Sequence, residues 1–309
     1  MRDLPKSTSS LGTIKPFSNI ELVVLDLDGT LVSGSSDLPG ELITYLKNVN
    51  RMNKVTITVA TGRTFFGAKA ILDQLGFLDL VHIVDKTPFA VVLYNGALVL
   101  NPKECAVIWH QMIGHQATKS IFNLAKKNFC DAFFYCVDST NMTAVETVYF
   151  SGVSTQPDFE FNGMPVQVFC DAPDFSATTV LLKASDESDL DELLCELGSI
   201  KEISVTSSGI GFIEIIPEGI SKAVGMGHWF KAPNMHWSSN EVLAIGDNDN
   251  DVELLEWAGI GVSVQNASAK ALEASDYRTN FGAKKAVIEV LKVLQQAQRY
   301  KKIQGIDYG

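Results

Sequence analysis

The chain has 309 residues, of which 46% are hydrophobic and 20% are charged, so it is long enough for one large domain or two ordinary ones. Its 25 basic and 36 acidic residues give a formal net charge of −11, without a basic cluster. Such a chain repels a phosphate backbone and an anionic membrane surface, so the charge argues against nucleic-acid and membrane partners.

Residues 1–19 combine Ser, Thr and Pro with three basic side chains and no continuous apolar segment, which predicts a flexible leader rather than a signal peptide. The chain contains no run of eighteen uncharged apolar residues, so no transmembrane span is predicted. The five cysteines are odd in number and lack CxxC spacing, which favours reduced, buried thiols over a disulfide framework or a zinc site. These features predict a soluble, cytoplasmic protein.

From residue 21 to about 94, short apolar runs alternate with helical patterns. The runs are ELVVL, VTITVA and FAVVLY, and the helical patterns cover residues 41–49 and 65–75. This order is typical of a parallel sheet with helices on both faces.

Residues 101–215 are more polar, and apolar and polar residues alternate in them. Strand-like runs are VETVYF, MPVQVFC, TTVLLKAS and GIGFIEII, and helical patterns lie near residues 116–128 and 188–198. We expect a separate α+β domain with an antiparallel sheet, with the aromatic string Phe133–Tyr135 in its core.

After residue 216 the first pattern returns. It comprises a helix near 221–230, the strand VLAIG, a helix near 250–258, the strand GIGVSV and a closing helix near 284–297. We therefore predict an α/β core from residues 20–100 and 216–309, into which residues 101–215 are inserted.

Two aspartates stand where the run VVLDLDGTLV meets a Gly-Thr turn. Asp26 and Asp28 are two residues apart and lie at the carboxyl end of a strand, where parallel α/β sheets bind ligands. Neighbouring carboxylates repel each other, and a hard divalent cation relieves that repulsion. The alternative is an ordinary strand-ending turn.

A second acidic cluster, GDNDND, follows the strand VLAIG. Helix capping is a sufficient explanation for the Asp and Asn residues at 249–251, but it leaves Asp247 unexplained. A carboxylate at this second strand end would complete the coordination of a Mg²⁺ ion that faces Asp26.

These motifs resemble those of the haloacid dehalogenase superfamily, specifically its Cof-type branch of C2-capped sugar phosphatases, over residues 20–297. The similar segments are, in motif order, DLDGTL at 26–31, ATGR at 60–63, Lys222 in GISK, and GDNDND at 246–251, with Asn95-Gly96-Ala97 similar to a further signature of the branch. Ala223, where glycine is common, and the leader depart from the pattern. The resemblance implies a Rossmann-like core, with residues 101–215 as an inserted C2-type cap.

The resemblance also implies a Mg²⁺-dependent phosphatase of small phosphate monoesters, with sugar phosphates as the expected substrates. Asp26 would be the nucleophile and Asp28 the general acid and base. Asp26, the Asp28 backbone carbonyl and Asp247 would bind Mg²⁺, and Asp251 would bind it or orient its ligands.

Phosphoryl oxygens need donors, and six residues are expected to supply them or to contact substrate: Thr61, Gly62, Arg63, Asn95, Lys222 and Asn250. Two of these residues have alternative interpretations without a role in the site. Lys222 could be a surface lysine at a helix start, although the helix dipole disfavours a cation there. Arg63 could touch substrate, brace the cap or be a solvated helix residue.

Two other functions remain open: a phosphomutase of the same superfamily, and a noncatalytic regulator that binds phosphosugars. The expected partner is a small phosphorylated metabolite, and the expected state is a monomer or weak homodimer. Release of free phosphate from a generic aryl phosphate would separate the phosphatase from both alternatives.

Overall fold

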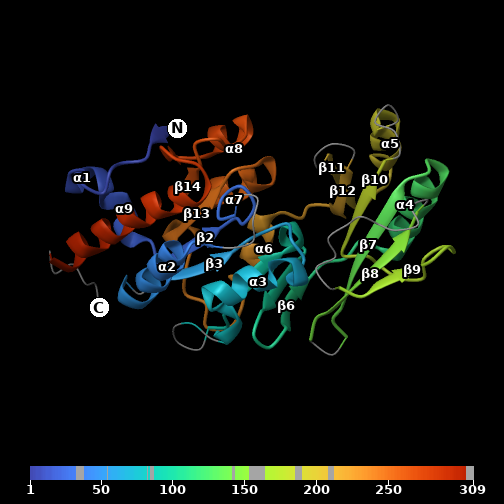
Figure 1. Cartoon of the computed structure of the whole chain (residues 1–309), viewed down its shortest axis with the longest axis horizontal. Coiled ribbons are helices and arrows are strands. Elements are labelled where there is room, and N and C mark those ends of the chain that lie inside the picture. The colour runs from blue at the N-terminus through green and yellow to red at the C-terminus, as the bar shows by residue number, and fades with distance from the viewer. Residues whose placement is uncertain are drawn as a thin grey trace. The chain divides into compact units, whose positions relative to one another are not determined.

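A computed structural model describes residues 1–32, 38–53, 55–81, 83, 87–140, 143–152, 164–184, 190–207 and 212–303. The chain divides into two compact units, whose elements are labelled in Figure 1. Unit 1 comprises Met1–Thr61, Ala70–Val91 and Trp229–Gly309, and unit 2 comprises Gly62–Lys69 and Val92–His228. Unit 2 thus contains the predicted insertion together with flanking segments, and the domain boundaries at residues 100 and 216 stay a prediction.

Unit 1 is built on a parallel sheet in the order β1-β15-β14-β13-β2-β3. Its strands are β1 (Arg2–Asp3), β2 (Leu22–Leu25), β3 (Thr56–Val59), β13 (Val242–Gly246), β14 (Ile260–Ser263) and β15 (Tyr277–Arg278). Every residue of the four central strands β2, β3, β13 and β14 is buried, as expected for a sheet covered on both faces. The predicted α/β core is confirmed.

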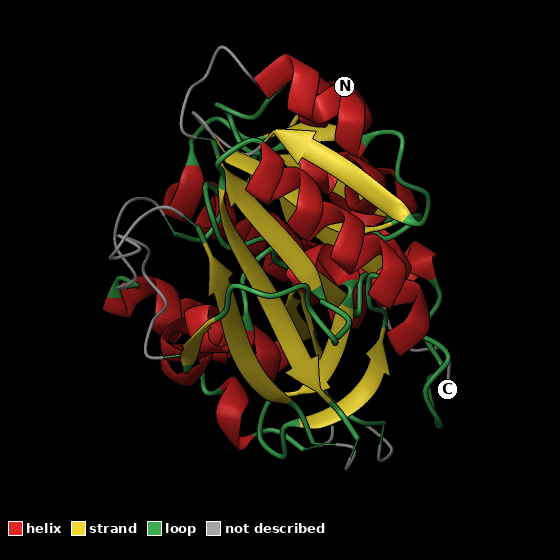
Figure 2. Ribbon diagram, turned by 90° about the vertical axis from the view of Figure 1, so that its right-hand side faces the viewer, coloured by secondary structure: helices red, strands yellow, loops and turns green. Residues whose placement is uncertain are grey.

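Like all other helices, the helices of unit 1 are red in Figure 2. They include α1 (Leu11–Ile14), η1 (Lys15–Asn19), α2 (Gly40–Asn53), α3 (Phe65–Leu75), which begins in unit 2, η7 (Asp249–Asp251), α7 (Val252–Trp257), α8 (Ala269–Ala274) and α9 (Ala283–Ile303). Helix α9 packs against α2 and η1, whereas α7 packs against α8. In the part of the chain that the structure describes, no helix has both the length and the apolar character needed to cross a bilayer.

Unit 2 contains a second sheet, in the order β11-β12-β10-β7-β8-β9. Its strands are β7 (Asp131–Asp138), β8 (Val145–Ser151), β9 (Val166–Val168), β10 (Thr179–Lys183), β11 (Ile203–Ser207) and β12 (Phe212–Pro217), and its helices are α4 (His115–Lys127) and α5 (Leu190–Leu197). All pairs are antiparallel except β8 and β9, which are parallel. The predicted α+β architecture is confirmed, with a parallel edge pair that the sequence did not indicate.

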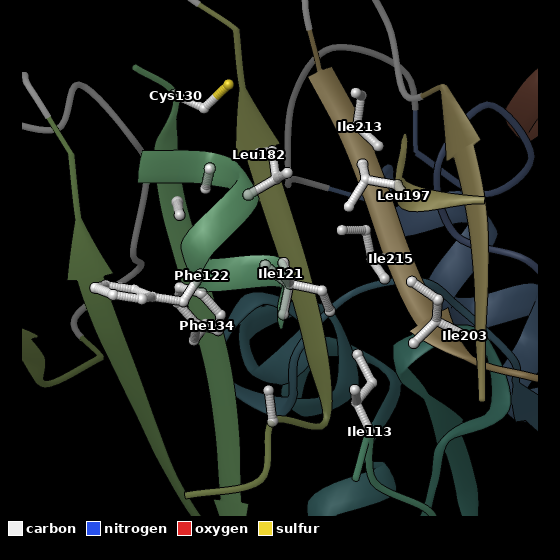
Figure 3. Close-up of a cluster of buried hydrophobic side chains, with 14 of the residues drawn as sticks. Ile113, Ile121, Phe122, Cys130, Phe134, Leu182, Leu197, Ile203, Ile213 and Ile215 are labelled. Carbon is white, nitrogen blue, oxygen red and sulfur yellow. The ribbon is translucent and has the colours of Figure 1, made fainter. Parts of the chain in front are cut away.

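One face of this sheet forms an apolar core with α4 and α5. In Figure 3, Ile121 of α4 lies among Phe134, Leu182 and Ile215, which come from three neighbouring strands. Phe133 and Phe134 are buried, so the assignment of the aromatic string to a core is confirmed.

The run FAVVLY does not continue the parallel sheet as the sequence predicted. It forms β4 (Val91–Leu93) of a separate sheet with β5 (Leu98–Asn101) and β6 (Ala106–His110). The turn at Tyr94–Gly96 returns the chain directly beside β4, so β5 becomes its partner. The parallel sheet is instead extended at its opposite edge by β15 and β1.

The segment expected to be a flexible leader is packed. Strand β1 pairs with β15, and Leu4, Ile14 and Phe17 are buried. The side-chain amide of Gln298 donates to the carbonyls of Ser18 (3.0 Å) and Ile20 (2.9 Å). The burial of Leu4, Ile14 and Phe17, together with the pairing of β1, therefore holds this segment against the rest of unit 1.

The five cysteines are free thiols, and their burial differs from the prediction. Cys130 is buried, but Cys170 and Cys195 are exposed. Apolar neighbours in sequence were a poor guide for Cys195, because adjacent residues of a helix such as α5 face different directions.

We expect Phe17→Ala to lower the free energy of unfolding by about 3–5 kcal/mol, since it removes a fully buried ring. That ring packs 5.3 Å from the Tyr277 ring, centroid to centroid. Urea denaturation followed by circular dichroism measures the change. Phe281→Ala, at a side chain that is 47% exposed in the same unit, is the matched control and should cost less than about 1 kcal/mol. Equal losses for both variants would contradict the packing of the N-terminal segment.

Candidate active site

Asp26 and Asp247 directly follow two neighbouring strands. The Asp26 amide donates to the Ile245 carbonyl at 3.0 Å, which continues the ladder between β2 and β13 by one residue. Asp247 comes immediately after β13. Because parallel strands end at the same edge of a sheet, both carboxylates lie at the edge where ligands bind in this class of fold.

Asp251 reaches the same edge from the loop that follows. Its Oδ2 atom accepts the backbone N–H groups of Asp247 (2.9 Å) and Asn248 (3.1 Å). The Asp251 side chain is fully buried. The capping role that the sequence suggested is thus real, and it folds GDNDND back toward the strand end.

Asp26, Asp247 and Asp251 each offer one carboxylate oxygen, and these oxygens lie within 4.8 Å of one another. Three anionic groups at this separation, two of them buried, repel strongly unless a cation or protons compensate. A donor set made only of carboxylate oxygens suits Mg²⁺ or Ca²⁺ and lacks the nitrogen and sulfur ligands typical of zinc. The three residues therefore fit the predicted magnesium site.

Glycine and threonine in these motifs make the close approach possible. Gly29 has φ +84°, and a Cβ atom there would lie 2.1 Å from Asp247 Oδ2. A Cβ atom at Gly246 would lie 2.6 Å from Asp251 Cγ. Thr30 donates its hydroxyl to Asp247 Oδ1 at 3.2 Å. The turn after Asp28 is therefore both a strand-ending turn and a wall of the acidic site.

The remaining predicted residues of unit 1 differ in exposure. Thr61 is buried just after β3, whereas the side chains of Asp28 and Asn250 are exposed. Asp28 is outside the group of three clustered carboxylates. The predicted metal contact of Asp28 is through its backbone carbonyl, so this exclusion does not test it. That contact and the roles of Thr61 and Asn250 stay predictions.

Gly62, Arg63, Asn95 and Lys222 belong to unit 2. Lys222 is the first residue of α6 (Lys222–Trp229) and is fully buried, so its reading as a surface lysine is wrong. The Arg63 guanidinium donates to the Gly67 carbonyl at 3.0 Å, which anchors it to helix α3. A Cβ atom at Gly62 would lie 3.0 Å from Asn95 Oδ1, so the Gly62 backbone lies close to the Asn95 side chain.

Asn95 and Lys222 converge on a glutamate that the sequence analysis missed. The Asn95 amide nitrogen donates to Glu214 Oε1 at 2.8 Å. Burial raises the pKa of Glu214, while the Asn95 hydrogen bond and the positive charge of Lys222 act in the opposite direction. The only signal in the sequence was a charged residue inside the apolar run GIGFIEII.

Clustered carboxylates at the strand ends of a parallel α/β sheet form an arrangement that could hold a divalent cation beside a bound ligand. The family model described as haloacid dehalogenase-like hydrolase matches residues 23–291, and the chain belongs to this family. The resemblance that the motifs predicted is confirmed.

Relatives and solved structures agree along nearly the whole chain. YxeH of Bacillus subtilis, named as a phosphatase, is 26% identical over 90% of this chain and 99% of its own length. A haloacid dehalogenase-like hydrolase from Bacteroides thetaiotaomicron superposes with a TM-score of 0.72 at 20% identity, over 90% of this chain and 99% of its own. The subclass IIB sugar phosphatase BT4131 gives 0.64 at 22% identity, over 93% and 99%.

We expect Asp251→Asn to weaken Mg²⁺ binding by roughly 10- to 100-fold, because the amide removes one negative charge from the cluster. Isothermal titration with MgCl₂ measures the affinity. Asp249→Asn is the matched control, since Asp249 lies in the same loop but is half-exposed and paired with Lys270 at 2.7 Å. A similar loss of affinity in both variants would contradict a metal site at Asp251.

Proposed function

We propose that this protein is a Mg²⁺-dependent phosphatase that hydrolyses small phosphate monoesters, with sugar phosphates as the substrate class. The observation that carries the proposal is the convergence of Asp26, Asp247 and Asp251 at neighbouring strand ends. The names of YxeH and of BT4131 support phosphatase chemistry, and the latter supports a sugar phosphate. YitU of Bacillus subtilis, 23% identical over 88% of this chain and 96% of its own length, is named as a phosphatase of a phosphoribitylamino-uracil, which is also a phosphorylated polyol.

Two displacements at phosphorus account for the reaction. In the first, an Asp26 carboxylate oxygen bonds to phosphorus as the ester P–O bond breaks, and Asp28 gives its proton to the departing alkoxide. In the second, a water oxygen bonds to phosphorus while Asp28 takes one of its protons, and the bond from phosphorus to Asp26 breaks. Inorganic phosphate leaves, and both carboxyl groups return to their starting protonation states.

The other motif residues stabilise charge on the transferring group. Thr61, the Gly62 N–H, Asn250 and the Lys222 ammonium supply donors for the equatorial phosphoryl oxygens, and Arg63 and Asn95 support this region. Asp26, the Asp28 backbone carbonyl and Asp247, with support from Asp251, would hold Mg²⁺, which would supply positive charge to offset the charge on the phosphoryl group. Residues 101–215 contribute contacts to the nonreacting part of the substrate, since all four motifs lie outside them.

A phosphomutase and a noncatalytic phosphosugar-binding protein are the competing functions. A mutase retains the phosphoryl group, and a binding protein does not cleave the ester. Steady release of phosphate from an aryl phosphate in the presence of MgCl₂, followed by a panel of phosphorylated sugars, tests the proposal against both. A wild-type protein that binds phosphosugars without releasing phosphate would contradict it.

We expect Asp26→Asn to abolish phosphate release, because the amide keeps the shape of the side chain but is not a nucleophile. Phosphate release from an aryl phosphate and the thermal melting temperature are measured together. Asp73→Asn, at an exposed carboxylate of α3, should leave the rate unchanged. Turnover of Asp26→Asn near that of the wild type, in a folded protein, would contradict the nucleophile assignment.

We expect Asp28→Ala to slow turnover by roughly 10²- to 10⁴-fold through loss of general acid and base catalysis. Mg²⁺ affinity should stay within about threefold of wild type, since the proposed metal contact of Asp28 uses its backbone carbonyl. Steady-state kinetics and MgCl₂ titration separate the two effects. Loss of Mg²⁺ binding in this variant would overturn the division of roles between Asp26 and Asp28.

A further inference from the structure

The turn that joins β4 to β5 has an unusual backbone. Tyr94, Asn95 and Gly96 have φ values of +51°, +51° and +105°, and all three residues are buried. Two consecutive residues other than glycine in the left-handed region are strained, and such strain persists only where the surroundings hold it. The contacts of this turn therefore show what it supports.

Each residue of the turn contacts a segment that carries a catalytic motif or a strand of the inserted sheet. The Tyr94 amide donates to the Arg63 carbonyl at 3.1 Å, and the Asn95 side chain donates to Glu214 of β12. At Gly96, a Cβ atom would lie 2.0 Å from the Ser221 carbonyl oxygen and 3.1 Å from the backbone nitrogen of Lys222. The turn thus spaces the segment of Arg63 from the segment of Lys222.

The Tyr94 side chain is held by Glu146 of β8. Its hydroxyl donates to Glu146 Oε1 at 2.5 Å, and the same carboxylate accepts the backbone N–H groups of Phe65 (2.7 Å) and Phe66 (2.9 Å). Those are the first two N–H groups of α3, which have no partner within the helix. The Glu146 side chain is only 3% exposed.

Thr64 completes this helix start. Its hydroxyl accepts the Gly67 N–H at 2.8 Å, so the first three amides of α3 are paired with Glu146 and Thr64. Burial raises the pKa of Glu146, and the hydrogen bonds from Tyr94, Phe65 and Phe66 oppose that shift. A carboxylate at a helix N-terminus is also favoured by the helix dipole.

Both glutamates lie on one face of the inserted sheet. Strand register pairs Glu214 with Leu181, Leu181 with Phe133, and Phe133 with Phe150. Because residues two apart in a strand share a face, Glu146 lies on the same side as Phe150. The opposite face carries Phe134 and the apolar core under α4 and α5.

We infer that Glu146 is a positioning residue for phosphoryl transfer, which fixes the start of α3 and the Tyr94–Gly96 turn and through them the backbone around Gly62 and Lys222. This inference rests on the proposed function and extends it: a residue of the insertion, outside all four motifs, acts on the rate of the chemical reaction. Glu146 does not touch substrate in this role.

The test compares Glu146→Gln and Tyr94→Phe with Tyr149→Phe, using an aryl phosphate and MgCl₂. The Glu146→Gln variant keeps the side-chain size but replaces one acceptor oxygen with an NH₂ group, which cannot accept a hydrogen bond from Tyr94, Phe65 or Phe66. We therefore expect kcat to fall roughly 10- to 100-fold, with KM changed less than about threefold. Tyr94→Phe removes one donor, so kcat should fall about 3- to 10-fold. Tyr149 lies on the same strand as Glu146, with its ring stacked 4.3 Å from Phe175, and its variant should stay within about twofold of wild type.

The double variant Glu146→Gln/Tyr94→Phe shows whether the two residues act through their shared hydrogen bond. If they do, the double variant should lose less than the product of the two single losses, because interacting residues are not additive. A loss equal to that product would overturn the proposed coupling between the turn and Glu146.

Two further outcomes are distinct. If Glu146→Gln lowers the melting temperature but leaves kcat within twofold of wild type, Glu146 only stabilises the fold and the inference is overturned. If Glu146→Gln fails to fold, the same result for Tyr94→Phe overturns the inference. The proposed function then stands. If wild-type protein with MgCl₂ releases no phosphate from any substrate, the proposed function fails and this inference falls with it.

Discussion

Electrostatic repulsion among Asp26, Asp247 and Asp251 is the constraint on which the rest of unit 1 depends. Their three oxygens lie within 4.8 Å at the ends of β2 and β13, which are central strands with buried residues. Backbone amides and the Thr30 hydroxyl offset part of the charge on Asp247 and Asp251. A divalent cation would offset the remainder, so the sheet, the two glycines and the capped loop together present three carboxylates that could hold one.

The carboxylates of unit 2 are stabilised in a different way. Glu146 accepts three neutral donors, and Glu214 accepts the Asn95 amide near the positive charge of Lys222. Buried carboxylates with such partners hold other groups in place. The three clustered carboxylates of unit 1 instead offer oxygens that lie within 4.8 Å of one another, an arrangement that could hold a metal ion. Both kinds of acidic residue accept neutral donors, so the presence of neighbouring carboxylates, more than burial, distinguishes them here.

Local sequence determined what could be predicted. The bounds of α3 match the predicted helix at 65–75, and the strand ends that carry Asp26 and Asp247 were placed correctly, because apolar periodicity and turn residues are local signals. The neighbours of β4 and the packing of Phe17 were missed, since both depend on partners distant in sequence. Glu146 was invisible for the same reason: its alternating strand VETVYF gives no sign that a helix start 80 residues earlier supplies its donors.

The two faces of the inserted sheet have separate tasks, and this separation bears on how substrate range can change. The face against α4 and α5 is apolar and supplies stability. The opposite face carries Glu146 and Glu214, which hold the strained turn between the segments of Arg63 and Lys222. If the insertion also selects substrate, loops and strand ends are free to vary for that purpose, whereas the positions around the two glutamates are constrained by the turn. Under the two proposals, selection and positioning would share one inserted domain because different residues of it would perform them.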